Sequence, residues 1–305
     1  MCPTTTLRLS FLILLTVGSL LLAGCGPSLK DSEMWAVDGE NGHAVVGTVL
    51  GIDREQGRAL VDHEEIPEFM PAMVMEFLIS RGDLEVLKEG MRIRARMVRT
   101  DDGFALSKIW PADLETDGII EAAGAALRQD TVIRGKAAYR EIGEDLPDFA
   151  LYDQNGDIAN AERFVGKQIV LNFIFTRCPD PKMCPASIAK MITLQGEARE
   201  KGVNNLELIS ITLDPEFDTP GILNEYATLR GIDTSNFTFL TGPETAIRDL
   251  ILQMGVLAFA EDGLVRHTLA TLLIDGKGAI IYRTDTSGWR VEDFARRLRV
   301  ADGAT

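Results

Sequence analysis

The chain has 305 residues, of which 46% are hydrophobic and 25% charged, and its formal net charge is −15 at pH 7. This length is enough for about two ordinary domains, each with its own core. The negative charge excludes a nucleic-acid-binding protein, because phosphate binding requires clustered Lys and Arg.

Residues 1–25 are expected to be a targeting segment. Arg8 precedes an apolar run, residues 9–22, which is short for a membrane span but typical of the central part of a signal peptide. The run ends in Leu-Ala-Gly-Cys, which resembles a bacterial lipobox and implies cleavage before Cys25 with a lipid on its sulfur. An uncleaved anchor or an ordinary signal peptide would also export the chain. We therefore expect an extracytoplasmic, membrane-anchored lipoprotein.

Export leaves few cysteines for the folded protein. Cys2 departs with the signal and Cys25 carries the lipid, so only Cys178 and Cys184 remain. Unpaired thiols are liabilities in an oxidising compartment. A structural disulfide that closes so short a loop would stabilise the fold little, and the pair therefore favours a functional role.

Two domains follow a tether at residues 26–43. Residues 44–112 contain five short alternating segments separated by turns, which predict a small five-stranded antiparallel β-barrel of the OB-like kind. Residues 113–145 are rich in Ala, Gly and charge, with one helical stretch near residues 119–128, and are expected to be a linker. The expected barrel strands are residues 45–50, 58–62, 72–78, 91–99 and 104–110.

Residues 146–305 predict a thioredoxin-like α/β domain. Residues 169–176 form a continuous apolar run, typical of a strand buried on both faces, and they lead directly into the cysteines. Strands then alternate with helices before a hairpin and a terminal helix, which is the thioredoxin-like order. The expected helices are residues 186–199, 220–230, 245–254 and 291–299, and the further strands are residues 206–213, 237–240, 269–274 and 279–283.

The cysteines flank the start of a predicted helix. The unpaired N–H groups and positive end of a helix favour thiolate over thiol. A thiolate is both the nucleophile of disulfide exchange and a soft ligand for copper(I). Pro179 and Pro185 restrict the loop and keep Cys184 near the first helical turn.

This region resembles the Sco/SenC family, thioredoxin-fold copper proteins that assist assembly of cytochrome oxidase. The matching stretches are the cysteine loop at residues 176–185, TLDPEFDTP at 212–220, HTLATLLID at 267–275 and LPDF at 146–149. The resemblance covers most of residues 146–300. It implies that Cys178, Cys184 and His267 bind copper, and that the partners are an oxidase copper subunit and a thiol reductant.

The cysteine spacing departs from that family, which usually has three residues between the cysteines where this chain has five. The longer loop must fold back, and a disulfide would need the two Cα atoms about 5–6 Å apart. Met183 adds a thioether beside Cys184, for which a packing or exposed role is expected. A peroxidase fits less well because Leu171 replaces its proline, and the Trp-Cys-x-x-Cys motif of thiol oxidoreductases is absent.

A second soft-ligand set lies in the barrel. Met73 and Met75 are two apart on a predicted strand, so both sulfurs project from one face. Thioethers do not titrate and hold copper(I) where thiols would oxidise. Methionine pairs are more often core filler, but Met70 just upstream and His63 at the end of the preceding strand favour a metal site.

Residues 44–112 resemble CusF-type periplasmic copper-binding domains, which use one His and a Met-x-Met pair. In that family a Trp covers the metal, and alignment on Pro71 places Met70 there. Met70 is then either a third sulfur ligand or an aliphatic lid. His43 is interpreted as an ordinary residue at the domain edge.

Both motifs offer ligands that suit copper(I), and the Cys/Cys/His site is also expected to bind copper(II). They predict an exported metallochaperone, and delivery to cytochrome oxidase is implied by the resemblance alone. Two alternatives stay open: a thiol-disulfide oxidoreductase that prepares a partner's cysteines, and a periplasmic copper-tolerance buffer.

Overall fold

The computed structural model describes residues 42–135, 138–261 and 264–300. The expected signal peptide, the lipid-bearing Cys25 and almost all of the tether lie outside these residues. Within them, no helix combines the length and the apolar composition that a membrane crossing requires.

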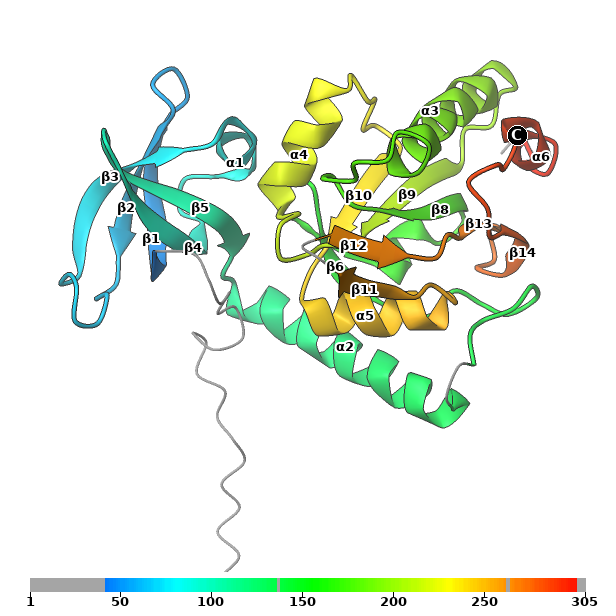
Figure 1. Cartoon of the computed structure of the whole chain (residues 1–305), viewed down its shortest axis with the longest axis horizontal. Helices are drawn as coiled ribbons and strands as arrows, with labels where there is room; N and C mark the ends of the chain where they lie inside the picture. Colours follow the sequence, from blue (N-terminus) through cyan, green and yellow to red (C-terminus); the bar gives the residue numbers. More distant parts are fainter. Residues whose placement is uncertain (1–41, 136–137, 262–263, 301–305) are drawn as a thin grey trace, which may run out of the picture. The chain divides into compact units, whose positions relative to one another are not determined.

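The N-terminal domain is a closed barrel of five strands in the order β1-β2-β3-β5-β4, which confirms the expected barrel. Alternate side chains such as Val49, Val61 and Phe77 fill its interior and are fully buried. The expectation of an all-antiparallel barrel is wrong at one seam, because β3 and β5 pair in parallel. A short helix and β4 separate these two strands in sequence, so the chain crosses one end of the barrel before β5 begins. The strands are β1 (His43–Asp53), β2 (Arg58–His63), β3 (Met73–Ile79), β4 (Arg92–Thr100) and β5 (Gly103–Pro111) (Figure 1).

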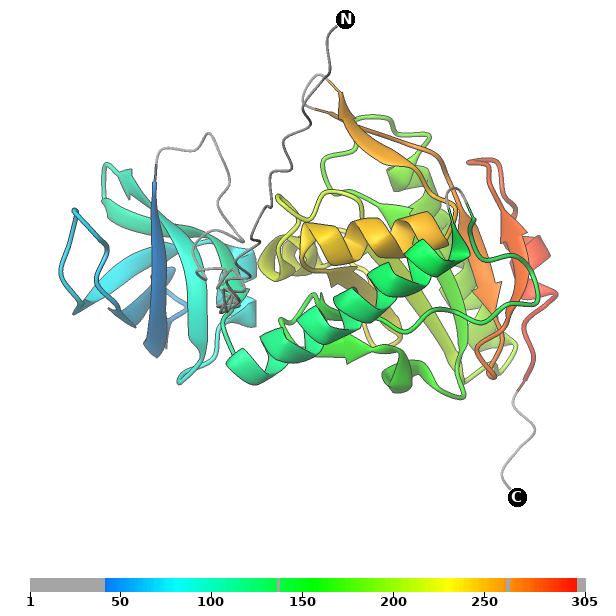
Figure 2. The ribbon, with the colours of Figure 1, turned by 90° about the horizontal axis from the view of Figure 1, so that it is seen from below.

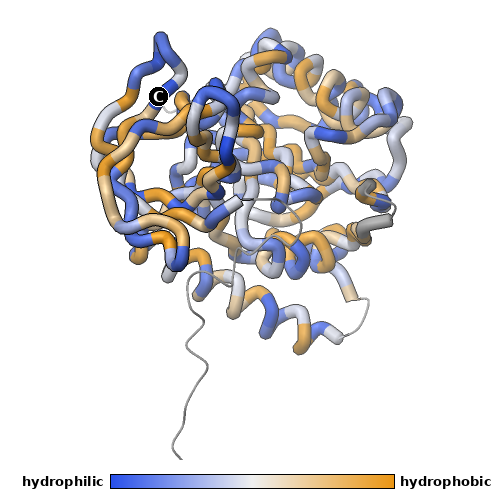
Figure 3. Tube along the Cα trace, turned by 60° about the vertical axis from the view of Figure 1, so that its left-hand side comes forward, coloured by the Kyte–Doolittle hydropathy of each residue, from blue (hydrophilic) through white to orange (hydrophobic). Residues whose placement is uncertain are grey.

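The segment expected to be a linker contains a long helix, α2 (Leu114–Arg134). Asp113 caps it by accepting a hydrogen bond from the backbone N–H of Thr116 at 2.8 Å. Hydrophobic and hydrophilic residues alternate along the helix (Figure 3), and Leu127 joins the core of the second domain. In both ribbon views α2 runs beside α5 (Glu244–Gln253) (Figure 2). The sequence predicted only residues 119–128 of this helix, because large apolar residues do not recur regularly along the Ala- and Gly-rich stretch.

The C-terminal domain is a thioredoxin-like α/β sandwich, as expected. Its sheet has seven strands in the order β14-β13-β8-β9-β10-β6-β7. The central strands β8 (Gln168–Ile174), β9 (Leu206–Thr212) and β10 (Phe237–Thr241) are parallel neighbours, and every one of their residues is buried. The outer strands are β6 (Ala150–Asp153), β7 (Ile158–Asn160), β13 (Thr271–Ile274) and β14 (Ile280–Thr284).

Helices cover both faces of this sheet. α3, α4 and α6 lie on one face, and α5 lies on the other with α2 beside it (Figure 1). The terminal helix α6 is shorter than the predicted residues 291–299, and β6 and β7 were not predicted. The helices on the first face are α3 (Cys184–Glu200), α4 (Pro220–Leu229) and α6 (Val291–Ala295).

The short barrel helix α1 (Arg81–Val86) packs closely against α4. A Cβ atom on Gly82 would lie 2.1 Å from the carbonyl oxygen of Gly221, so only glycine permits this approach. The contact buries Asp83, whose carboxylate accepts a hydrogen bond from the Ser80 hydroxyl at 2.7 Å. Burial, with a smaller contribution from the charge of Glu225, raises the pKa of Asp83 to about 6.

Asp83 makes stability depend on pH in a definite direction. Between about pH 4 and pH 6 the folded state retains a proton that the unfolded state has lost, so the free energy of unfolding falls as pH rises, by up to about 3 kcal/mol. We expect Asp83→Asn to be more stable than the parent by about 1–3 kcal/mol at pH 7.5 and equal to it near pH 4. Urea unfolding followed by the fluorescence of buried Trp110 measures both values. An equal difference at the two pH values would contradict this assignment, and Asp102→Asn in an exposed turn is the control.

Candidate metal centre

The two cysteines lie at the start of α3. Cys184 is the first residue of this helix, and Cys178 lies in the loop that follows β8. Both thiols are free, Cys184 is 1% exposed, and Cys178 is half-buried and packs against the core. The Cys178 thiol donates to the carbonyl of Asp180 at 3.8 Å. Burial strongly raises the pKa of Cys184, and the neighbouring Cys178 raises it further.

His267 approaches the cysteines from a separate hairpin, β11 (Ala258–Glu261) and β12 (Leu264–His267). The sequence placed His267 at the start of the following strand and did not predict this hairpin. His267 is instead the last residue of β12 and pairs with Ala258. Two hydrogen bonds of 2.9 Å close the base of the hairpin: the Thr268 backbone N–H donates to the Leu257 carbonyl, and the Leu257 backbone N–H donates to the Thr268 hydroxyl. The hairpin projects from the sheet (Figure 2).

The His267 ring presents an unprotonated nitrogen to sulfur. Its Nδ1 lies 2.8 Å from the Thr268 carbonyl oxygen, which can only accept, so Nδ1 carries the proton. Nε2 lies 3.9 Å from Sγ of Cys184. Burial lowers the pKa of His267, which favours the neutral ring.

This separation suits a bridging metal ion. Metal–sulfur and metal–imidazole bonds of about 2.3 and 2.0 Å place sulfur and nitrogen about 3.7–4.3 Å apart at angles between 120° and 180°. The described residues contain no group of three His, Cys, Asp or Glu side chains already gathered as a metal site. A three-ligand set would need the Cys178 thiol as well, which in this structure donates to the Asp180 carbonyl.

Two carboxylates anchor the cysteine loop, and sequence analysis assigned neither a role. Asp218 accepts hydrogen bonds from the backbone N–H and the hydroxyl of Thr176 and from the hydroxyl of Thr212. Asp214 pairs with Arg177 at 2.6 Å, and the Arg177 guanidinium lies 4.1 Å from the Phe217 ring centre. The sequence did contain a signal for the role of these carboxylates, because residues 212–220 place a cluster of polar residues directly after a buried strand.

The unequal burial of the thiols predicts unequal reactivity. Thiolate is the reactive form, and burial raises the pKa of Cys184 and disfavours it there, whereas the Cys178 thiol is half-buried and more accessible to a reagent. We expect iodoacetamide at pH 8 to modify Cys178 at least about tenfold faster than Cys184 in the reduced, metal-free protein. Peptide mass mapping over time measures both rates, and the two rates should converge in 6 M urea. Faster modification of Cys184 would contradict the assignment.

The barrel holds a second imidazole whose Nδ1, like that of His267, lies against a backbone carbonyl oxygen. His63 ends β2, is 1% exposed, and lies with Nδ1 2.7 Å from the Glu64 carbonyl oxygen. Nδ1 therefore carries the proton, and the buried Nε2 has no hydrogen-bond partner among the described residues. A buried nitrogen without a partner is costly unless a ligand uses it.

Two of the candidate methionines lie on β3, the strand that pairs with the His63 strand. Met73 is the cross-strand partner of His63, and it is 43% exposed at the beginning of β3. Met75 is on the same face of β3 and packs with Met70 against the barrel core. Met70 is held by a bridge to Ile66. In the segment between β2 and β3, the ring of Phe69 stacks on the ring of His43, with 3.9 Å between centroids.

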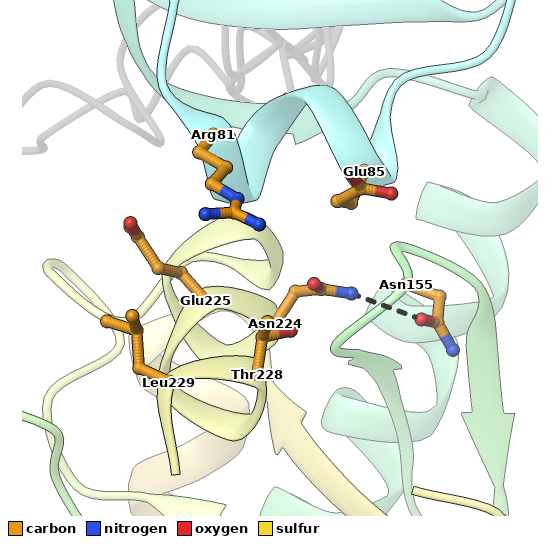
Figure 4. A pocket seen from close by; sticks show the side chains of 8 residues that line it. Arg81, Glu85, Asn155, Asn224, Glu225, Thr228 and Leu229 are labelled. Atoms are coloured by element: carbon orange, nitrogen blue, oxygen red, sulfur yellow. Dashed lines mark hydrogen bonds between the residues drawn. The ribbon is translucent and has the colours of Figure 1, made fainter. Parts of the chain in front are cut away.

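One hollow of about 360 Å³ lies between α1 and α4 (Figure 4). Arg81 and Glu85 line it from α1 and Glu225 from α4, and Asn224 donates to Asn155 across one side at 3.4 Å. None of its lining residues is Cys, His or Met. The hollow is therefore not a soft-metal site.

The fold and ligands together define a thioredoxin-like thiol protein with an attached OB-like barrel. The SCO1/SenC family model matches residues 139–300. The model of copper binding periplasmic protein CusF matches residues 42–111. The chain belongs to the SCO1/SenC family and carries a CusF domain at its N-terminal side.

Similar proteins come from distant organisms. An SCO2-like protein of Rickettsia typhi is 33% identical over 165 residues, which cover 51% of this chain and 77% of the relative. The mitochondrial protein SCO2 homolog of Bos taurus is 30% identical over 54% of this chain and 63% of its own length. Among solved structures, an SCO1/SenC family lipoprotein from Bacillus anthracis is 30% identical over 53% of this chain and 97% of that chain, with a TM-score of 0.48.

Proposed function

We propose that this protein is an exported copper(I) metallochaperone with two separate soft-metal sites. The first comprises Cys178, Cys184 and His267. The 3.9 Å approach of His267 Nε2 to Cys184 Sγ, with the ring proton held on Nδ1, is the observation that carries the proposal. Thiolate and imidazole are ligands that copper(I) accepts, and the hydrogen bond that fixes the tautomer also orients the ring.

The second site comprises His63, Met73 and Met75, with Met70 as the third sulfur or as the lid. The buried lone pair of His63 Nε2 supports it, as does the pairing of His63 with Met73. The match to the CusF model supports the same metal. Because both sites are open and offer few ligands, copper can pass between ligand sets without release as a free ion.

Family membership supports delivery of copper to cytochrome oxidase as the role of the thioredoxin-like domain. A thiol reductant is then required, since copper(I) binding needs both cysteines reduced. A thiol-disulfide oxidoreductase is the second candidate, favoured by two free cysteines at one helix start, one of them accessible. Reduction of a disulfide substrate by metal-free protein, with only weak copper binding at Cys178, would favour that candidate. If loss of Cys178 left copper resistance intact and oxidase assembly unaffected, the protein would be a copper-tolerance buffer.

Copper titration of the reduced protein tests the proposal. We expect two copper(I) ions to bind, with Cys178→Ser and Met73→Leu each weakening one site by at least about 100-fold and leaving the other unchanged. A competing chromophoric chelator reports the stoichiometry and affinity. Met97→Leu in the barrel core and Met183→Leu beside Cys184 are the matched controls and should bind like the parent. A single site, or loss of both ions in either variant, would contradict two separate sites.

We also propose that a lipid on Cys25 anchors the protein to a membrane on the extracytoplasmic side, on the basis of the lipobox-like residues 22–25. A Cys25→Ser variant should move from the membrane fraction to the soluble extracytoplasmic fraction, and the parent should incorporate labelled palmitate. Labelling that persists in Cys25→Ser would refute this anchor.

A further inference from the structure

Asp218 is a fully buried carboxylate in the loop between β9 and α4. It accepts hydrogen bonds from the Thr176 backbone N–H at 3.1 Å, from the Thr176 hydroxyl, and from the Thr212 hydroxyl at 2.6 Å. The carboxylate thereby joins the ends of the two central strands at the point where the cysteine loop leaves β8.

Burial raises the pKa of Asp218 to about 6, so its carboxylate is ionised at and above neutral pH, and no cation pairs with it among the described residues. The nearby guanidinium of Arg177 is paired with Asp214 instead. In the described part of the chain, the donors to Asp218 are amide and hydroxyl groups, which stabilise a charge without cancelling it. A buried carboxylate without a counterion exerts a stronger field on its surroundings than a solvated one, because the local dielectric constant is low.

This carboxylate anchors the beginning of the cysteine loop. Thr176, which Asp218 holds, is two residues before Cys178. Burial raises the pKa of Tyr226 on α4 to about 12; Arg230 opposes the shift, and the charges of Cys184, Asp218 and Cys178 add to it. The Thr176 contact therefore places the Asp218 charge at the base of the loop that carries Cys178.

We propose that Asp218 is a positioning residue that sets the preference of the Cys178/Cys184/His267 site for copper(II) over copper(I), an inference that rests on the proposed function. Two thiolates and a neutral imidazole carry a charge of −2, so the site is neutral with copper(II) and has a charge of −1 with copper(I). Reduction adds one electron from an external reductant and changes no protein bond. A fixed carboxylate opposes the extra negative charge, so Asp218 lowers the reduction potential of bound copper.

The test measures the potential in a Met73→Leu background, which removes the barrel site. Copper-loaded protein is titrated with a reductant in the presence of redox mediators, and the visible absorption of thiolate-bound copper(II) reports the oxidised fraction. Asp218→Asn keeps the size and removes the charge. We expect the ratio of copper(I) to copper(II) affinity to rise about tenfold, which is about 59 mV in potential. Thr212→Val removes one hydrogen bond that partly offsets the carboxylate charge, so at pH 8, where the carboxylate stays ionised, it should shift the potential less and in the opposite direction.

Glu207→Gln is the matched control. Glu207 is a buried carboxylate too, but it lies at the other end of β9 from Thr212 and pairs with Lys167 at 2.8 Å. Removal of the Glu207 charge should therefore leave the potential unchanged. Equal weakening of copper(I) and copper(II) in Asp218→Asn, with an unchanged potential, would show that the residue only orders the loop. A shift of the same size in Glu207→Gln would also overturn the proposal. If the background protein bound no copper, the proposed function itself would fail.

If Asp218→Asn does not fold, Thr212→Val still decides the question. This substitution preserves both hydrogen bonds that Thr176 donates to Asp218. A potential identical to that of the background protein would therefore contradict the electrostatic role.

Discussion

The contact between Nε2 of His267 and the sulfur of Cys184 depends on where one proton resides. The carbonyl of Thr268 holds that proton on Nδ1, which leaves a lone pair facing the sulfur. Placing this ring requires a hairpin outside the central sheet, and placing the sulfur requires a helix that begins at the cysteine itself. The buried strand β8, the helix α3 and the β11–β12 hairpin together bring the ligands into contact.

The barrel fixes the tautomer of its imidazole in the same way as the thioredoxin-like domain, but the candidate ligands beside it differ. His63 also donates through Nδ1 to the carbonyl of the next residue, so both imidazoles present an unprotonated Nε2. Its neighbouring ligands are thioethers, which do not titrate, whereas those of His267 are thiols, which do. The proposed barrel site would therefore hold copper(I) without a reductant, while the proposed thiol site would depend on the redox state of its cysteines.

Sequence patterns predicted the parts of the fold whose causes are local. The continuous apolar run of β8 and the alternation of the barrel strands led to the correct fold classes. The β11–β12 hairpin was missed because it is a short pair outside the main sheet and lacks a strong apolar pattern. The parallel pairing of β3 with β5 depends on closure of the barrel, which no single segment encodes.

Candidate ligands were accessible from the sequence because soft-metal chemistry limits them to Cys, Met and His. Asp218 was not, since its hydrogen-bond partners come from separate segments, Thr176 from the loop after β8 and Thr212 from the end of β9. X-ray absorption of copper(I) bound to the Met73→Leu protein tests the central claim most directly. The account predicts two sulfur ligands and one imidazole nitrogen, with the nitrogen lost in His267→Ala. A sulfur-only site, or a nitrogen signal that survives that substitution, would contradict it.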